Sequence, residues 1–212
     1  MPEAAALLAL ARRLLPPGCA VAGADPSRPW PLIPGEALPG ATPPRLAEFS
    51  AGRHAARRAL QMLGLPTVAI PMADDRAPLW PEGVAGSITH SRHACLAALR
   101  LGAPLGLDLE EDEDLPPDLW DVVLMPGEQD WARAQPAPGR AAKLIFSAKE
   151  AAYKAQYPIS QQLFGFDRMA ITVTAGVFVA RFRQPVAPFA ADHVLPGFWG
   201  HAAGHLLTAV AL

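Results

Sequence analysis

The sequence is poor in the features that mark secreted, membrane-spanning and nucleic-acid-binding proteins. Only two of its 212 residues are cysteines, Cys19 and Cys95. Two cysteines are too few for a disulfide framework, so we expect reduced thiols in a cytoplasmic protein. The formal net charge is −2, which gives no overall basic field to hold nucleic acid. The apolar stretch Ala4–Leu10 is too short to span a bilayer, and its flanking charges are reversed from those of a secretory signal, which favours a short surface helix over Met1–Leu15.

Common nucleotide-binding and hydrolase motifs are also missing. The chain contains no GxxxxGK[ST] phosphate loop, no GxGxxG fingerprint and no GxSxG elbow. His201 and His205 have i,i+4 spacing, but Gly200 and Gly204 flank them and no Glu lies between them, which argues against a zinc-binding helix. Any phosphate or metal chemistry therefore has to rest on other residues.

The composition is that of a folded protein of one ordinary domain or two small ones, with 51% apolar residues. The 24 prolines are unevenly spread. From Pro16 to Pro44 they interrupt a segment without a sustained hydrophobic period, for which we predict irregular, extended chain laid over a folded body. A second interruption runs from Pro116 to Pro138.

Hydrophobic periodicity predicts helices over Ala47–Leu63 and Ala141–Tyr157, the second closed by Pro158. The order of elements is helix, strands, helix, strands, so we predict an α+β fold of two halves, residues 1–104 and 105–212, joined near Gly102–Leu107. Apolar alternation and turn signals, including Ala175-Gly176, mark the strands. The predicted strands are Thr67–Pro71, Val84–His90, Ala94–Leu101, Leu105–Glu110, two within Phe166–Arg183, and the last within Phe198–Leu212.

Two acidic residues share one face of a predicted strand. In Leu105–Glu110 the leucines alternate with the other residues, so Asp108 and Glu110 lie opposite the apolar face. Two like charges on one face repel each other unless a cation or solvent separates them. On this pattern alone the pair is either half of a metal site or a solvated strand end.

The segment Ile145–Ala155 places Glu150 one helical turn before Lys154, nearly opposite the apolar stripe. Such a pair can be an ordinary surface ion pair worth about 0.3–0.5 kcal/mol. Together with Asp108 and Glu110, however, Glu150 supplies the hard oxygen ligands that suit Mg²⁺, and the neighbouring lysines can neutralise phosphate. The combination points to phosphate chemistry on a magnesium ion.

Further candidates for phosphate binding lie upstream. The run Gly86–Ser91 combines a glycine, small hydroxyl residues and a histidine, although a strand end with a surface histidine has the same pattern. Arg53 and Arg57 are one helical turn apart and flank an apolar stripe, whereas Arg58 points away from it. Arg76 lies in a predicted turn before Pro78.

In this order, the segments Phe49–Leu60, Arg76–Ser91, Gly106–Glu110 and Phe146–Ala155 resemble the 4′-phosphopantetheinyl transferases. The last two carry the family's GxDxE and FSxKExxYK signatures. The likeness is strongest to the monomeric surfactin-synthetase-activating type, in its enterobactin synthase component D-like branch. It implies two pseudo-symmetric α+β halves with the active site between them.

The resemblance also implies an activity: Mg²⁺-dependent transfer of phosphopantetheine from coenzyme A to a serine of an apo carrier protein, with release of adenosine 3′,5′-bisphosphate. The carrier could belong to fatty-acid, polyketide, peptide-synthetase or siderophore synthesis. Asp108, Glu110 and Glu150 would hold the metal, and Glu150, directly or through a metal-bound water, would be the general base. The implied coenzyme A contacts are Arg53, Arg57, Arg76, Ser87, Thr89, His90, Lys149 and Lys154, of which Lys154 also stabilises the leaving phosphate.

Two other functions remain open from the residues alone. A different magnesium-dependent phosphohydrolase would use the same three acids, but would leave Arg53, Arg57 and His90 without a common role. A non-catalytic homologue that only docks carrier proteins would have no use for three metal ligands.

Overall fold

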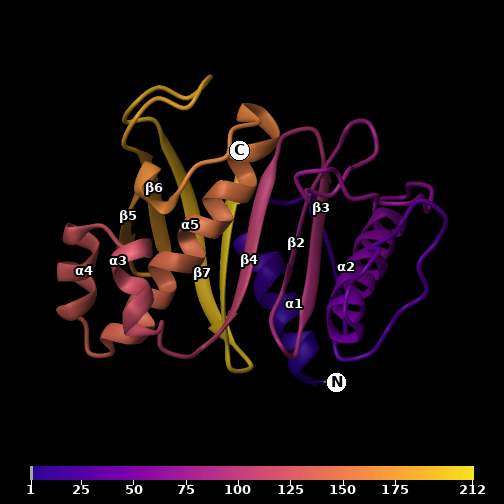
Figure 1. Cartoon of the computed structure of the whole chain (residues 1–212), viewed down its shortest axis with the longest axis horizontal. Coiled ribbons are helices and arrows are strands. Elements are labelled where there is room, and N and C mark those ends of the chain that lie inside the picture. The colour runs from indigo at the N-terminus through magenta and orange to yellow at the C-terminus, as the bar shows by residue number, and fades with distance from the viewer. Residues whose placement is uncertain (1) are drawn as a thin grey trace.

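The computed structural model describes residues 2–212. The chain forms two antiparallel β-sheets that stand side by side (Figure 1). The first sheet has the strand order β1-β3-β2, with strands β1 (Ala20–Ala24), β2 (Val84–His90) and β3 (Cys95–Leu101). The second has the order β4-β8-β7-β6-β5, with strands β4 (Leu105–Glu111), β5 (Met169–Thr174), β6 (Val177–Phe182), β7 (Val194–Ala202) and β8 (His205–Ala211).

The two halves repeat one arrangement, so the predicted α+β fold is confirmed. In each half, one strand is followed by a long helix and later by a hairpin whose last strand pairs with the first: β1 with β3, and β4 with β8. The second half adds the β5–β6 hairpin, which extends its sheet at the far edge. The halves are thus related in topology but unequal in size.

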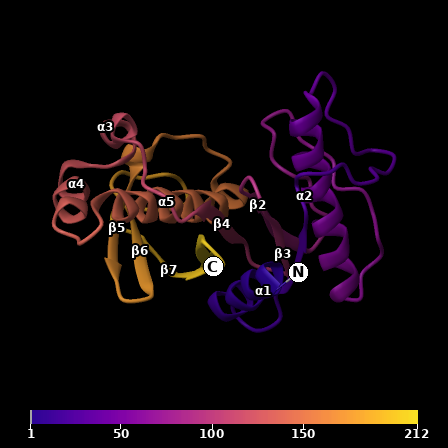
Figure 2. The ribbon, with the colours of Figure 1, turned by 90° about the horizontal axis from the view of Figure 1, so that it is seen from below.

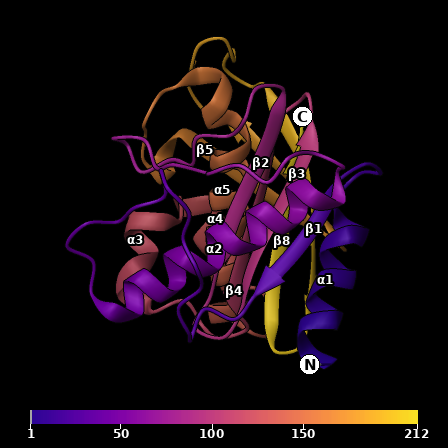
Figure 3. The same ribbon diagram turned by 90° about the vertical axis from the view of Figure 1, so that its right-hand side faces the viewer.

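Each sheet carries a long helix on one face. Helix α2 (Pro43–Met62) packs on β1 and β3, and α5 (Pro138–Ser160) crosses β4 and β8 (Figures 2 and 3). Helix α5 approaches β4 so closely that a side chain at Gly106 would place its Cβ 1.9 Å from the carbonyl oxygen of Ala151. Only glycine fits this crossing, which brings Glu150 and Lys154 over the acidic face of β4.

A third helix joins the halves from another side. Helix α1 (Pro2–Leu14) contacts β1 of the first sheet and β7 and β8 of the second. Its leucines enter one apolar cluster with Leu105, Leu107 and Leu109 of β4, all fully buried. The leucine face of β4 is therefore in the core, as its alternation predicts. No helix within residues 2–212 is both long and apolar enough to cross a membrane.

Most of the predicted elements are present, with shifted ends. Strand β2 has the predicted bounds, β3 and β4 differ by one residue at one end, and the turn at Ala175-Gly176 separates β5 from β6. Helix α2 begins earlier than predicted because Pro43 and Pro44 occupy its first turn, where proline is tolerated.

Two predictions about regular elements were wrong. Thr67–Pro71 is extended but is not a strand, since side chains satisfy its backbone: Ile70 donates its N–H to Glu36 and accepts a hydrogen bond from Arg53. Pro158 does not close α5, which continues to Ser160 and ends where Gln161 adopts a left-handed conformation, φ 53°. Pro158 removes only the one i→i−4 hydrogen bond of its own missing N–H, and just two helical residues follow it.

The two proline-rich segments are more ordered than predicted. Pro16–Pro44 contains strand β1 and then wraps around α2, where Trp30 stacks on His54. Pro116–Pro138 contains three short elements: the 3₁₀ turn η1 (Pro117–Leu119), α3 (Trp120–Val123) and α4 (Pro126–Arg133). Another 3₁₀ turn, η2 (Phe166–Arg168), precedes β5. These segments escape periodicity arguments because their elements are too short to show a period.

Candidate active site

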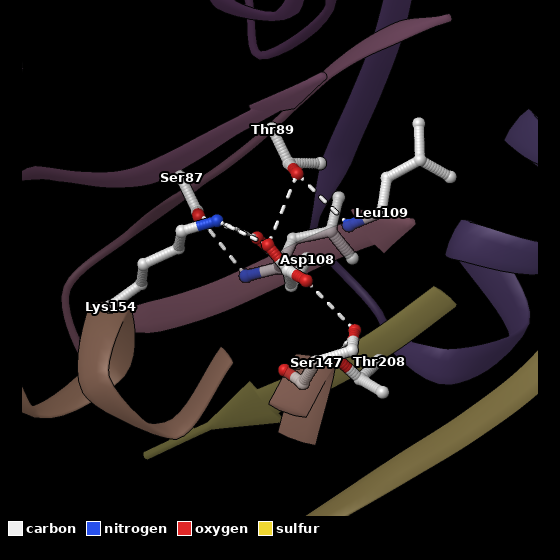
Figure 4. A network of polar contacts seen from close by, with 8 residues as sticks. Ser87, Thr89, Asp108, Leu109, Ser147, Lys154 and Thr208 are labelled. Atoms are coloured by element: carbon white, nitrogen blue, oxygen red, sulfur yellow. Dashed lines mark hydrogen bonds and ion pairs between the residues drawn. The ribbon is translucent and has the colours of Figure 1, made fainter. Parts of the chain in front are cut away.

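The halves meet where β2 packs against β4, and side-chain hydroxyls bridge the two strands (Figure 4). The N–H of Leu107 donates to Ser87 Oγ at 3.0 Å, and that of Leu109 donates to Thr89 Oγ1 at 2.9 Å. These contacts replace the backbone ladder that would join two strands of one sheet. Ser87 and Thr89 therefore fix β4 relative to the first half, and both are buried.

Asp108 lies at the centre of this junction. Its Oδ1 accepts a hydrogen bond from Lys154 Nζ at 2.6 Å, and its Oδ2 accepts one from Ser147 Oγ at 2.8 Å (Figure 4). Thr89 Oγ1 is 3.4 Å from Oδ1. The side chain of Asp108 is 6% exposed, whereas that of Lys154 is 28% exposed. The carboxylate is thus embedded in the wall, and the ammonium it holds reaches solvent.

Glu150 and Glu110 complete an acidic group. Burial raises the pKa of Glu150, as do the charges of Asp108 and Glu110, while Lys154 opposes the shift. The pKa of Glu110 is also raised, first by burial and then by Asp108, against an ion pair with Lys143 at 3.0 Å. The charge of Asp108 thus disfavours ionisation of both Glu110 and Glu150, and a cation bound beside them would favour it.

This donor set fits Mg²⁺ in its chemistry. Mg²⁺ prefers oxygen ligands and usually takes one or two carboxylates, several waters and substrate phosphates. Within residues 2–212, no group of three or more His, Cys, Asp or Glu side chains is placed to hold a metal ion by itself. An open set of carboxylates beside a groove suits a cation that is shared with a phosphorylated substrate.

A groove of about 600 Å³ runs between the halves beside these acids, a size typical of pockets for small organic ligands. Its wall in the first half is cationic and aromatic. The guanidinium of Arg53 lies 4.1 Å from the centre of the Phe49 ring, and Arg45 Nη1 is 3.1 Å from His90 Nε2. Glu150, Tyr153 and Lys154 of α5 form the opposite wall.

The cations of this wall are partly desolvated. Burial lowers the pKa of Arg53 to about 10, so it remains charged at neutral pH. The pKa of His90 is lowered as well, first by burial and then by Arg45 and Lys154, against Glu48. Arg53 thus presents a desolvated positive charge that attracts an anion such as phosphate, whereas His90 is uncharged at neutral pH.

The mouth of the groove is bordered by the loop 73–77, in which Arg76 has a left-handed conformation, φ 72°. The loop reaches the other half through a hydrogen bond that Tyr157 of α5 donates to Asp75. Deeper in the groove, the indole of Trp80 lies against Gly86, where a Cβ would come within 2.8 Å of Trp80. The result is a flat apolar surface next to the cationic wall.

The structure brings most of the predicted site residues together, but not all of them. Arg53, Arg76, Ser87, His90, Glu150 and Lys154 line the groove, with Asp108, Glu110 and Thr89 in or behind its wall. Arg57 is bonded to Glu36 and to the Pro31 carbonyl, outside the groove. Lys149 is enclosed by Glu128 and the carbonyl oxygens of Val123 and Phe166. Neither cation is placed to contact a ligand in the groove.

Some groove residues were missed by the sequence analysis. Arg45 is eight positions before Arg53 and thus shares its helix face, a signal that was lost because the predicted helix began at Ala47. Thr208, in contact with Ser147, follows only from the pairing of β8 with β4. No local pattern reveals that pairing.

Comparisons with known proteins agree with this architecture. Residues 34–100 match the 4′-phosphopantetheinyl transferase N-terminal domain, and residues 104–199 match the 4′-phosphopantetheinyl transferase superfamily. The chain is 37% identical to 4′-phosphopantetheinyl transferase Svp of Streptomyces mobaraensis over 199 residues, covering 85% of this chain and 78% of that protein.

Two further relatives match the chain at similar identity. Identity is 34% over 180 residues to 4′-phosphopantetheinyl transferase PptT of Mycobacterium tuberculosis, covering 79% of each chain. It is 33% over 157 residues to enterobactin synthase component D of Salmonella typhimurium, covering 73% of this chain and 61% of that protein. The chain belongs to the 4′-phosphopantetheinyl transferase superfamily and is an enzyme of that class.

Proposed function

We propose that this enzyme transfers the 4′-phosphopantetheine group of coenzyme A to a serine hydroxyl of an apo carrier protein, releasing adenosine 3′,5′-bisphosphate. The observation that carries the proposal is the groove between the halves, which has desolvated cations on one wall and an acidic group with a lysine on the other. A nucleotide with a terminal phosphate and a pyrophosphate matches that distribution of charge.

The first half would bind the nucleotide. Arg53 and Arg45, with the uncharged His90 beside them, form a group suited to the 3′-phosphate, and Trp80 offers a flat surface for the adenine ring. Ser87 and Thr89 contribute by holding the strand that carries Asp108, since their hydroxyls are engaged with β4. We assign this binding to residues 1–104 and the chemistry to residues 105–212.

The second half would perform the transfer. Mg²⁺ held by Asp108, Glu110 and Glu150 would neutralise charge on the pyrophosphate. The serine oxygen bonds to the phosphorus that carries pantetheine, and the bond from this phosphorus to the bridging oxygen breaks. Glu150, which lines the groove, would take the serine proton directly or through a water. Lys154 stabilises the negative charge that develops on the leaving bisphosphate.

The uncharged arm of coenzyme A would lie in a second cavity, which shares Glu150 and Tyr153 with the groove. This smaller cavity has a volume of about 140 Å³, and its walls are mostly aromatic and apolar. We propose that it holds part of the pantetheine chain. Its lining consists of Lys149, Glu150, Tyr153, Phe164, Gly165, Phe166 and Met169.

One chain supplies both walls of the groove, which supports action as a monomer. The intact mass of an apo carrier protein tests the proposal directly. We expect a phosphopantetheine adduct after incubation with the enzyme, coenzyme A and Mg²⁺, and none when Mg²⁺ is omitted or Glu150→Ala replaces the wild type. Parallel peptide-synthetase, polyketide, siderophore and fatty-acid carriers would identify the partner.

Two results would contradict the proposal. Release of inorganic phosphate without an adduct on any carrier would indicate a phosphohydrolase. Binding of coenzyme A and carrier without transfer would indicate a docking protein.

A further inference from the structure

Thr208 of β8 lies directly opposite Asp108 in the pairing of β8 with β4. It is fully buried, and it falls outside residues 104–199, the part of the chain that matches the superfamily. Its hydroxyl oxygen is 2.9 Å from Ser147 Oγ and 2.8 Å from the Ser147 carbonyl oxygen (Figure 4). Three elements, β4, β8 and α5, thus meet at one small polar cluster.

The Asp108 carboxylate fixes which atom donates in the hydrogen bond between Asp108 and Ser147. Asp108, as the carboxylate partner of Lys154, can only accept hydrogen bonds. The single proton of the Ser147 hydroxyl therefore goes to Asp108 Oδ2, at 2.8 Å. Thr208 has one hydroxyl proton, which it donates to the Ser147 carbonyl oxygen at 2.8 Å, while its own oxygen lies 2.9 Å from Ser147 Oγ and so holds the serine from both sides.

We infer that Thr208 and Ser147 are positioning residues of the transfer reaction, which hold the Asp108 carboxylate in the orientation that serves Lys154 and a divalent cation. The inference rests on the proposed function above. Ser147 is fully buried, so its hydroxyl has no water to replace a lost protein partner. Thr208 contacts both Ser147 oxygens and thereby prevents the serine from turning away from Asp108.

This arrangement has a functional consequence because Asp108 also holds Lys154. If Oδ2 lost its donor, the carboxylate could rotate, and both its bond to Lys154 at 2.6 Å and its position toward a cation would change. Partners that orient a metal-binding carboxylate change metal affinity or activity by about 10–100-fold when they are removed.

The test compares Thr208→Val, which keeps the shape but removes the donor, with Thr208→Ser, which keeps the donor. Titration calorimetry would give the Mg²⁺ dissociation constant in the presence of coenzyme A. We expect Thr208→Val to raise this constant, and to lower kcat, by about tenfold. Thr208→Ser should stay near the wild type, and the KM for coenzyme A at saturating Mg²⁺ should change little in both variants.

A double variant tests whether Thr208 acts through Ser147. Ser147→Ala should weaken Mg²⁺ binding at least as much as Thr208→Val does. Adding Thr208→Val to Ser147→Ala should weaken it no further, because residues that share one interaction are not additive. Additive losses would show that Thr208 acts independently and would overturn the inference.

The matched control is Ser50→Ala, which removes a buried hydroxyl from α2 that bonds Trp30 N–H and the Ala47 carbonyl. It should lower thermal stability without changing Mg²⁺ affinity. Wild-type Mg²⁺ affinity in Thr208→Val or, if that variant fails to fold, in Ser147→Ala would overturn the inference. Absence of transfer by the wild type would instead contradict the proposed function.

Discussion

Two lysines of α5, five residues apart, have ion pairs of nearly equal length and different surroundings. Lys149 lies 2.7 Å from Glu128, and the exposed fractions of the two side chains are 2% and 5%. Lys154 lies 2.6 Å from Asp108, and the lysine side chain is 28% exposed, toward the groove. The first ammonium donates to three protein oxygens, whereas the second can still reach a ligand.

The same contrast recurs on α2. Arg57 is bonded to Glu36, whose side chain is completely buried. Arg53 uses its Nε for the Ile70 carbonyl and presents its guanidinium over Phe49 in the groove. Each long helix therefore carries one cation sealed by a carboxylate and one that faces the groove, although Arg53 and Arg57 are almost equally buried, at 6% and 7% exposed. The comparison teaches that charge alone does not mark a functional residue, because what matters is where its hydrogen bonds go.

The largest expected effect follows from replacing Lys154, the lysine that faces the groove. Lys154→Met should lower kcat by about 10²–10³-fold, since a preorganised charge that stabilises the transition state is lost. Its stability should fall as well, because Asp108 is only 6% exposed and loses its ion-pair partner, but by less than in a sealed pair, since water can reach the place of the 28% exposed lysine and Ser147 still donates to Asp108. Steady-state transfer to a carrier protein and urea unfolding would be measured together. Wild-type kcat in a folded Lys154→Met variant would contradict the role of this residue.

Replacing Lys149, the lysine sealed by Glu128, should mainly lower the stability of the protein and not its kcat. Lys149→Met leaves Glu128 buried without its cation, so we expect the free energy of unfolding to fall by about 3–5 kcal/mol. Burial lowers the pKa of Lys149, and the Glu128 charge opposes this shift, which fits an ammonium maintained by its partner. Urea unfolding measures the loss.

The control for Lys149→Met adds Glu128→Gln. Glutamine removes the unpaired charge and still accepts a hydrogen bond where Glu128 accepts from Met125 and Ile171. Part of the lost stability should return. A folded Lys149→Met variant with wild-type stability and weaker coenzyme A binding would show that the ammonium acts on the ligand in the small cavity that it lines, and not on stability.

The sequence analysis assigned all four of these cations to the coenzyme A site, because nothing in the local sequence separates those that face the groove from those sealed by a carboxylate. Glu128 and Glu36, the carboxylates that seal Lys149 and Arg57, each precede their partner by 21 positions. Both lie in the two proline-rich segments, for which the sequence analysis predicted no regular element. The motifs in β4 and α5 could be identified because acids, apolar residues and glycine recur there at regular spacing. Burial of a cation by a distant loop leaves no such pattern.

The arginines of α2 give the next test of the comparison. Arg57→Ala should lower the free energy of unfolding by about 3 kcal/mol, because Glu36 loses its buried partner. Arg53→Ala should instead weaken coenzyme A binding by about tenfold, the loss expected for one charged hydrogen bond. Calorimetric titration of coenzyme A and urea unfolding of both variants would separate the two roles. Unchanged coenzyme A affinity in Arg53→Ala would refute its assignment.

The smallest expected effect is a pH dependence of coenzyme A binding at His90. Burial lowers the pKa of this imidazole from its ordinary value of 6.5. As the pH falls below 6.5, the unfolded chain therefore takes up a proton at His90 before the folded protein does, and the contribution of His90 to stability is lost.

A bound phosphate favours the protonated form of His90 and raises its pKa again. Binding should therefore take up a proton, and affinity should increase as the pH falls, by about tenfold for each unit by which the ligand raises the pKa. Calorimetry in buffers of different ionisation enthalpy would detect this proton, and it should disappear in His90→Asn. Equal proton uptake by the variant and the wild type would show that the coenzyme A phosphates themselves, rather than His90, account for the pH dependence.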